Sequence, residues 1–159
     1  DVVRFLKIFT FKSREEIEAL AVEVAERPHQ RAAQKALAAS VTELVHGADQ
    51  LQRVLAATDA LWGGGDIRDL DEATLVAATA DLPRASLTVG ESTVADALVA
   101  LGFEKGKTAA RRTISSGGAS INNVKVEDPE AVLAEEDVLA GGLALIRKGR
   151  KNLAVLELS

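Results

Sequence analysis

Basic side chains gather in two short windows of the C-terminal half of the sequence. The first window holds Lys105, Lys107, Arg111 and Arg112, and the second holds Arg147, Lys148, Arg150 and Lys151. A helix capped by Thr108 would place Arg111 and Arg112 in its first turns, where the helix dipole opposes positive charge by about 0.3–1 kcal/mol. The free backbone amides of such a helix start, together with the cations, predict a phosphate-binding site. The alternative, that both windows are solvated charges, stays open.

The residue types around these windows indicate which kind of nucleic acid they would bind. From residue 86 onward the sequence has no tyrosine, and Phe103 is its one aromatic residue. Stacking platforms for single-stranded bases are therefore scarce, and recognition of backbone and shape in folded RNA is favoured. Asn122 and Asn123 can hydrogen-bond sugar or phosphate, although the formation of a tight turn explains them equally well.

The first half of the sequence has helical periodicity. Ser13 and Glu16 form a capping-box pattern, which predicts a helix that ends before Pro28. Further helices are expected over residues 30–46, over about 48–62, and from a cap at Asp71 to about residue 80. The Gly63-Gly64-Gly65 run is expected to end the helix over about 48–62. Residues 1–82 are therefore predicted to form an all-helical unit.

A connection is expected over residues 83–92, where Pro83 and Gly90 break the periodicity. Two short helices should follow, the first capped by Thr93 with Asp96 and the second by Thr108. Beyond Gly118 the period changes to two, which predicts strands at 119–121, 124–126, 143–147 and 152–158. Residues 93–159 are therefore expected to form a small helix-helix-strand domain, and the whole chain has the fold class α+β.

Composition excludes several other classes of function. The 159 residues include no cysteine, 47% are hydrophobic, and the formal net charge is −5. Disulfides and thiolate metal sites are therefore excluded, and a cytoplasmic globular protein without membrane spans is expected. His29 and His46 make no convincing zinc site on their own, and the acidic run at 135–137 is typical of a solvated surface. We therefore expect no catalytic residue, metal or cofactor in this chain.

The segment TVADALVALGFEKGKTAARRTISSGGASINNVKV, residues 93–126, resembles the S-four-type RNA-binding domain. The features that match are the Ala-Arg-Arg stretch at 110–112, the Gly-Gly pair at 117–118 and the Asn-Asn turn at 122–123. The resemblance implies that this helical corner contacts structured RNA. The eleven residues assigned by this reasoning are Lys105, Lys107, Thr108, Arg111, Arg112, Asn122, Asn123, Arg147, Lys148, Arg150 and Lys151.

The segments HQRAAQKALAASVTELVHG, DVVRFLKIFTF and IRKGRKNLAV are similar to the C-terminal region of bacterial tyrosyl-tRNA synthetases. That resemblance implies a tRNA(Tyr)-binding part whose residues 1–82 belong to the anticodon-recognition region. It also implies that ATP and magnesium serve a catalytic part upstream, because the ATP-binding signatures of these enzymes are absent here. The parent is expected to be a homodimer and this portion a monomer.

Two alternatives remain beside this interpretation: an RNA-modifying enzyme that carries the same type of domain, and a module that binds another protein. The apolar density of the first nine residues and the missing initiator methionine favour a chain cut from a longer protein, in which upstream residues cover this end.

Overall fold

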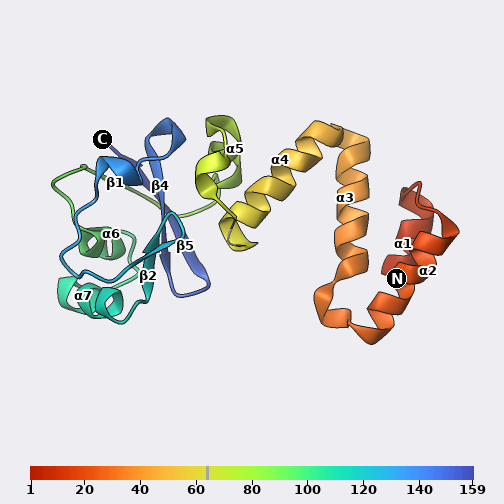
Figure 1. Ribbon diagram of the computed structural model, residues 1–159, viewed down its shortest axis with the longest axis horizontal. Coiled ribbons are helices and arrows are strands. Elements are labelled where there is room, and N and C mark those ends of the chain that lie inside the picture. Colours follow the sequence, from red (N-terminus) through yellow and green to blue (C-terminus); the bar gives the residue numbers. More distant parts are fainter. Residues whose placement is uncertain (64) are drawn as a thin grey trace. The chain divides into compact units, whose positions relative to one another are not determined.

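A computed structural model describes residues 1–63 and 65–159 of the chain (Figure 1). The contacts between residues divide it into two compact units, residues 1–55 and 56–159. Helices account for the first unit, whereas the second combines helices with a five-stranded sheet. The predicted α+β class is confirmed.

The first unit begins with three helices, α1 (Val2–Phe9), α2 (Arg14–Glu26) and α3 (Ala32–His46), and α4 (Ala48–Thr58) starts within it. The predicted capping box at the start of α2 is present. The Glu16 amide donates to Ser13 Oγ at 3.2 Å, and the Ser13 amide donates to Glu16 Oε2 at 2.7 Å. Gly47, at φ +85°, ends α3 as its C-cap, because glycine alone adopts such a conformation without strain.

The core of the first unit is small. Leu6 of α1, Ile17 of α2 and Ala33 of α3 are its buried members. Other apolar side chains of this unit, among them Phe5, Ile8, Phe9, Phe11, Leu44 and Val45, are exposed. The apolar start of the chain therefore contributes only one face of α1 to a core.

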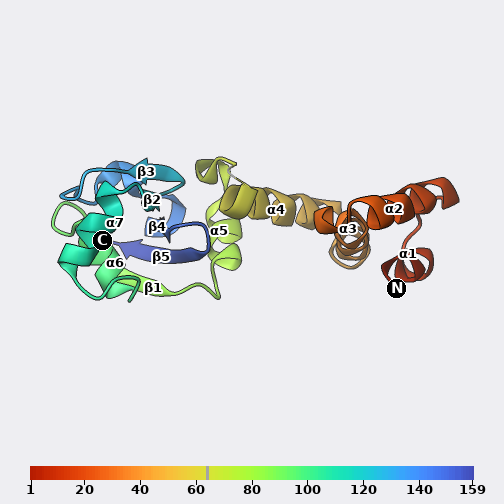
Figure 2. The ribbon, with the colours of Figure 1, turned by 90° about the horizontal axis from the view of Figure 1, so that it is seen from below.

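The second unit is built on five strands: β1 (Arg84–Leu87), β2 (Ala119–Ile121), β3 (Val124–Val126), β4 (Leu143–Lys148) and β5 (Asn152–Leu158). Their order in the sheet is β1-β5-β4-β2-β3, which can be followed from bottom to top in Figure 2. β1 runs parallel to β5, and the other neighbouring pairs are antiparallel.

Both faces of this sheet are covered. On one face, α6 (Val94–Ala100) and α7 (Lys107–Ser115) pack against Ala144 and Ile146 of β4. On the other, the end of α4, the π-helical turn Asp59–Gly63 and α5 (Glu72–Ala78) supply residues that pack against Leu143 and Leu145. Figure 1 shows α6 and α7 on one side of β4 and β5, with α5 on the other. Successive strand residues are buried because each face has its own core.

The structure differs from the sequence-based expectations in the region that links the helices of the first half to the sheet. Residues 83–92 are not a plain connection, because Arg84–Leu87 form β1 and pair with β5 in the register Arg84↔Val155 to Leu87↔Leu158. The helix expected over residues 48–62 ends at Thr58 and continues as the π-helical turn. The two compact units also divide at residues 55 and 56, well before the predicted linker. Gly64, in the predicted glycine stop, lies outside the described residues.

Candidate nucleic-acid interface

Helix α7 (Lys107–Ser115) carries three residues of the first basic window, with Lys105 in the loop before it, and the helix begins earlier than predicted. Gly106 is its N-cap residue and accepts from the Ala110 amide at 3.0 Å, and no side chain caps the helix. Lys107 is therefore the first helical residue, and Thr108 lies exposed in the first turn instead of capping the helix. The cap prediction was wrong because Gly106 adopts the extended conformation of a cap, which left no place for Thr108 outside the helix.

The second basic window contacts residues that flank the first in the sequence. Lys148 Nζ, at the end of β4, donates to the Phe103 carbonyl at 2.6 Å and pairs with Glu104 Oε1 at 2.9 Å. The Gly149 amide donates to the Gly118 carbonyl at 2.8 Å. The turn between β4 and β5 therefore contacts the segments on both sides of α7.

Three basic residues of the predicted RNA-binding site are paired with carboxylates. Lys107 Nζ lies 2.7 Å from Asp96 Oδ1, and Arg111 contacts both oxygens of Glu130, at 2.7 and 3.0 Å. The third pair joins Lys148 to Glu104. The positive charge that a phosphate would meet at these three positions is partly neutralised.

These contacts also change the acidity of two of the carboxyl groups. The hydrogen bonds from Lys107 and then from Thr93 lower the pKa of Asp96 from 3.8 to about 2. The Thr113 hydroxyl, followed by Lys148, lowers the pKa of Glu104. Both carboxylates are thus held in the charged form that keeps their cations in place.

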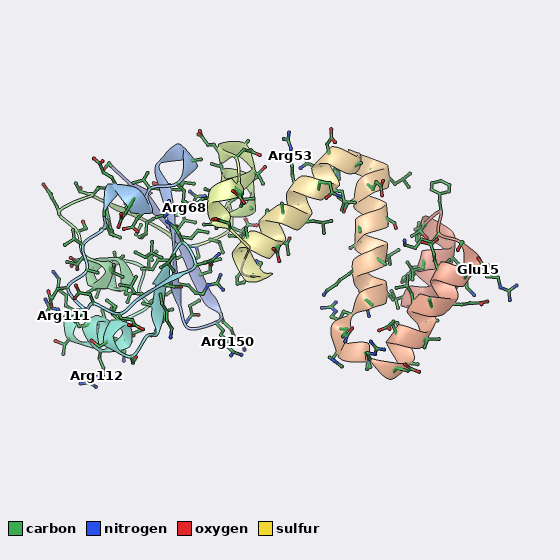
Figure 3. The ribbon with its side chains drawn as sticks, viewed as in Figure 1. Glu15, Arg53, Arg68, Arg111, Arg112 and Arg150 are labelled. Carbon is green, nitrogen blue, oxygen red and sulfur yellow. The ribbon has the colours of Figure 1, made fainter. Side chains whose placement is uncertain are left out.

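Five other cations of this unit have a side chain with neither an ion pair nor a hydrogen bond within the described part of the chain, unlike Arg68 and Arg147, which donate hydrogen bonds to carbonyl groups. We call them the unpaired basic set: Lys105, Arg112, Lys125, Arg150 and Lys151. All five are exposed. Figure 3 shows Arg112 on α7 and Arg150 at the β4–β5 turn extending away from the unit along its lower margin. These side chains retain their full charge toward a ligand.

Lys125 was not among the residues selected from the sequence. It lies on the edge strand β3, and its Nζ is 3.1 Å from the point that a Cβ on Gly117 would occupy. The side chain therefore extends over the Gly117–Gly118 bend that follows α7. The predicted hairpin already contained the relevant signal, since it pairs Lys125 with Ser120 on β2, the strand that follows this bend.

Arg147 has a role inside the fold. Its guanidinium donates to the Leu61 carbonyl and to Asn123 Oδ1, the latter at 3.4 Å, and lies 5.4 Å from the centre of the Trp62 ring. Trp62 is about half exposed, and the guanidinium lies over its ring as a cation–π partner. Arg147 ties β4 to the π-helical turn.

The two asparagines of the β2–β3 turn also serve the fold. Asn122 and Asn123 have φ values of +48° and +67°, which confirms the predicted tight hairpin. Asn122 is only 6% exposed, and it bonds the Asp137 carbonyl and the Leu145 amide at 2.7 and 2.8 Å. Asn123 Nδ2 donates to the Ala60 carbonyl at 2.7 Å. Neither amide group is free for RNA in this arrangement, and burial removes Asn122 from the surface.

Residues 1–63 and 65–159 contain neither a metal-binding cluster nor a membrane-spanning helix. No three histidine or acidic side chains gather into a group that could hold a metal ion. Among the helices that the structure describes, none is long and apolar enough to cross a membrane.

Comparison with known proteins gives a consistent family assignment. Residues 74–156 match the tyrosine–tRNA ligase SYY-like C-terminal domain. The tyrosine–tRNA ligase of Streptomyces avermitilis is 50% identical over 159 residues, covering 100% of this chain, and that of Nocardia farcinica is 47% identical, covering 97%. The chain spans 37% of the length of each of these curated relatives. The chain therefore belongs to the tyrosine–tRNA ligase SYY-like C-terminal domain family.

Proposed function

We propose that this chain is the tRNA-binding part of a tyrosine–tRNA ligase and that it holds the sugar-phosphate backbone of tRNA(Tyr). The observation that carries the proposal is the unpaired basic set, whose members come from α7 and the loop before it, from β3 and from the β4–β5 turn of one unit. Family membership supports tRNA as the nucleic acid. Residues 93–159 would supply these contacts, and residues 1–82 would take part in anticodon recognition.

The aromatic residues of the second unit support recognition of backbone and shape over base stacking. Phe103 packs against the core formed by α6, α7 and the sheet, and Trp62 has Arg147 over its ring. Phe103 is therefore not a free platform for a base, and Arg147 takes one face of Trp62. Phosphates, which every nucleotide presents, are the groups that the exposed cations suit best.

For the whole protein we propose the joining of tyrosine to its tRNA in the cytoplasm by a homodimer that uses ATP and magnesium. The names of the relatives support the tyrosine–tRNA ligase reaction. The larger part of each relative lies outside the region that this chain matches, and catalysis would reside there.

A salt titration of tRNA(Tyr) binding to the chain tests the proposal. Five phosphate contacts predict that log K falls with log salt with a slope of about −4. Replacing Arg112, Lys125, Arg150 and Lys151 by glutamine should reduce the slope to about −1 and weaken binding at low salt. Arg84→Gln is the control, because Arg84 pairs with Glu157 at the opposite edge of the sheet from β3. Binding without salt dependence, or equal slopes for the quadruple variant and the unaltered chain, would overturn the proposal.

A further inference from the structure

Glu104 is an acidic residue placed among the cations of the proposed tRNA surface. It follows α6 in a loop that is fixed to that helix, since the Phe103 and Glu104 amides both donate to the Leu98 carbonyl, at 2.9 and 3.1 Å. Its side chain is 14% exposed, accepts a hydrogen bond from the Thr113 hydroxyl of α7 and pairs with Lys148. The carboxylate is therefore held by its neighbours and is not a mobile surface charge.

This carboxylate joins three segments that the chain order separates. The loop before α7 supplies Glu104, α7 supplies Thr113, and the end of β4 supplies Lys148. The adjacent Gly149 amide adds the bond to Gly118 on the far side of α7. Through these contacts the β4–β5 turn, which carries Arg150 and Lys151, is held against the helix that carries Arg112.

Coulomb's law alone would count Glu104 as harmful to RNA binding, because it adds a negative charge and neutralises a lysine. A surface selected only for positive charge would have a neutral residue here. A carboxylate at position 104 favours RNA binding only if the placement of the surrounding cations contributes more to binding than the one positive charge that Glu104 neutralises.

We propose that Glu104 is a positioning residue for tRNA: it fixes the β4–β5 turn against α7 so that cations from both elements meet one stretch of phosphate backbone. This inference rests on the proposed function. Glu104 acts through Lys148 and Thr113 and does not contact the RNA. A charge-assisted hydrogen bond is about twice as strong as a neutral one, so a carboxylate holds the lysine better than an amide would.

The test compares two near-isosteric substitutions in the 159-residue chain, Glu104→Gln and Glu130→Gln. Each removes one negative charge from a residue that pairs with a cation of the same surface, but Glu130 is exposed and joins only Arg111. We expect Glu104→Gln to weaken tRNA(Tyr) binding about threefold or more and to make the salt slope shallower. Glu130→Gln should strengthen binding by up to about twofold, because it frees Arg111.

The Lys148→Met chain provides a second arm. In the Lys148→Met chain, Glu104 has no lysine to hold. Adding Glu104→Gln to this chain therefore removes only an uncompensated negative charge, and the affinity for tRNA(Tyr) should rise instead of falling. If Glu104→Gln acted only by destabilising the fold, it would lower the affinity for tRNA(Tyr) in both chains, and the sign of its effect would not reverse. Hydrogen exchange of the Gly149 amide should also quicken in Glu104→Gln, while exchange in the core strands stays slow. If Glu104→Gln fails to fold, Thr113→Val replaces it, and a smaller loss of affinity in the same direction is expected.

The outcomes separate the two proposals. If the unaltered chain shows no salt-sensitive tRNA binding, the proposed function fails and the positioning role fails with it. If the unaltered chain binds but Glu104→Gln binds equally well or better, only the positioning role is overturned.

Discussion

At the scale of single residues, ion pairs divide the cations of the second unit into two classes. Arg111 and Arg112 are neighbours on α7, yet Arg111 is engaged by both oxygens of Glu130 and Arg112 has no ion pair in the described chain. Exposed pairs of this kind contribute about 0–1 kcal/mol to the stability of the fold. Their main effect here is to reduce the positive charge that Arg111 presents to a ligand. Equal residue types at adjacent positions therefore need not contribute equally to RNA binding.

The two arginines give a matched prediction. Arg112→Gln and Arg111→Gln each change the net charge by one unit on the same helix, so long-range attraction should fall equally. Arg112→Gln should in addition lose a phosphate contact, with a loss of tRNA affinity of about 1 kcal/mol and a decrease of about 0.8 in the steepness of the salt slope. Fluorescence-detected binding over a salt series measures both quantities. Equal effects of the two substitutions would show that net charge alone governs binding.

Asp96 gives a prediction of pH dependence. Its pKa is lowered from 3.8 to about 2 in the folded chain by Lys107 and Thr93, so ionised Asp96 stabilises the fold above pH 3.8. This contribution should be lost as the pH falls through about 2. Asp96→Asn should therefore be less stable than the unaltered chain at pH 5–7, and the difference should shrink between pH 4 and pH 2. Urea unfolding over that pH range measures it, and a constant difference would contradict the prediction.

At the scale of elements, the β2–β3 turn shows how a hairpin can connect parts of the fold. The Asn122 side chain reaches both the Leu145 amide and the Asp137 carbonyl, and Asn123 reaches the Ala60 carbonyl. The turn therefore requires positive φ values and also two amide side chains whose hydrogen bonds extend beyond the hairpin. Asparagine satisfies both demands because its short side chain tolerates the left-handed region.

Two substitutions at Asn122 separate these demands. Asn122→Ala should reduce the free energy of unfolding by about 2–4 kcal/mol, because it leaves the buried Leu145 amide without its acceptor and strains a residue at φ +48°. Asn122→Gly loses the same hydrogen bonds without that strain, and it should be about 1 kcal/mol more stable than the alanine variant. Chemical denaturation measures both values. An alanine variant as stable as the glycine variant would show that the backbone conformation carries no strain.

At the scale of the whole molecule, the sheet of the second unit depends on residues that precede its first strand. Leu143, Leu145, Leu153 and Val155 face the core supplied by residues 57–75, among them Leu61 and Leu75. Exposure of those four strand residues would cost about 1.5–3 kcal/mol each, which together approaches the total stability of an ordinary domain. The second unit is therefore expected to need residues 56–82 to fold.

Shortened chains test this dependence. A chain of residues 56–159 should unfold cooperatively and reversibly, whereas residues 83–159 should aggregate or unfold at a much lower denaturant concentration. Denaturation followed by circular dichroism, with light scattering for aggregation, distinguishes them. As a control, the four strand residues Leu143, Leu145, Leu153 and Val155 are replaced by polar residues in the chain of residues 83–159. This variant should be soluble, because the apolar face that residues 56–82 normally cover is then removed. Equal stability of the two shortened chains would place the boundary of the folding unit at the predicted linker instead.

Local patterns in the sequence determined most of the elements. The capping boxes at Ser13 and Thr93 lie at the starts of α2 and α6, and the period of two after Gly118 marks β2, β3, β4 and β5. These features act over a few residues, so neighbours along the chain contain the information. The two basic windows are likewise visible as composition, and the hairpin turn that carries the second was predicted.

Tertiary structure decided what those patterns could not. β1 exists because β5 lies beside it, and its four residues have no strong signal of their own. Asp96, Glu104 and Glu130 decide which cations are partly neutralised. Each of these carboxylates pairs with a cation on another segment of the chain. The role of Asn122 inside the fold is fixed by partners 15 and 23 residues away. Contacts between distant segments set burial and pairing, which no local period encodes.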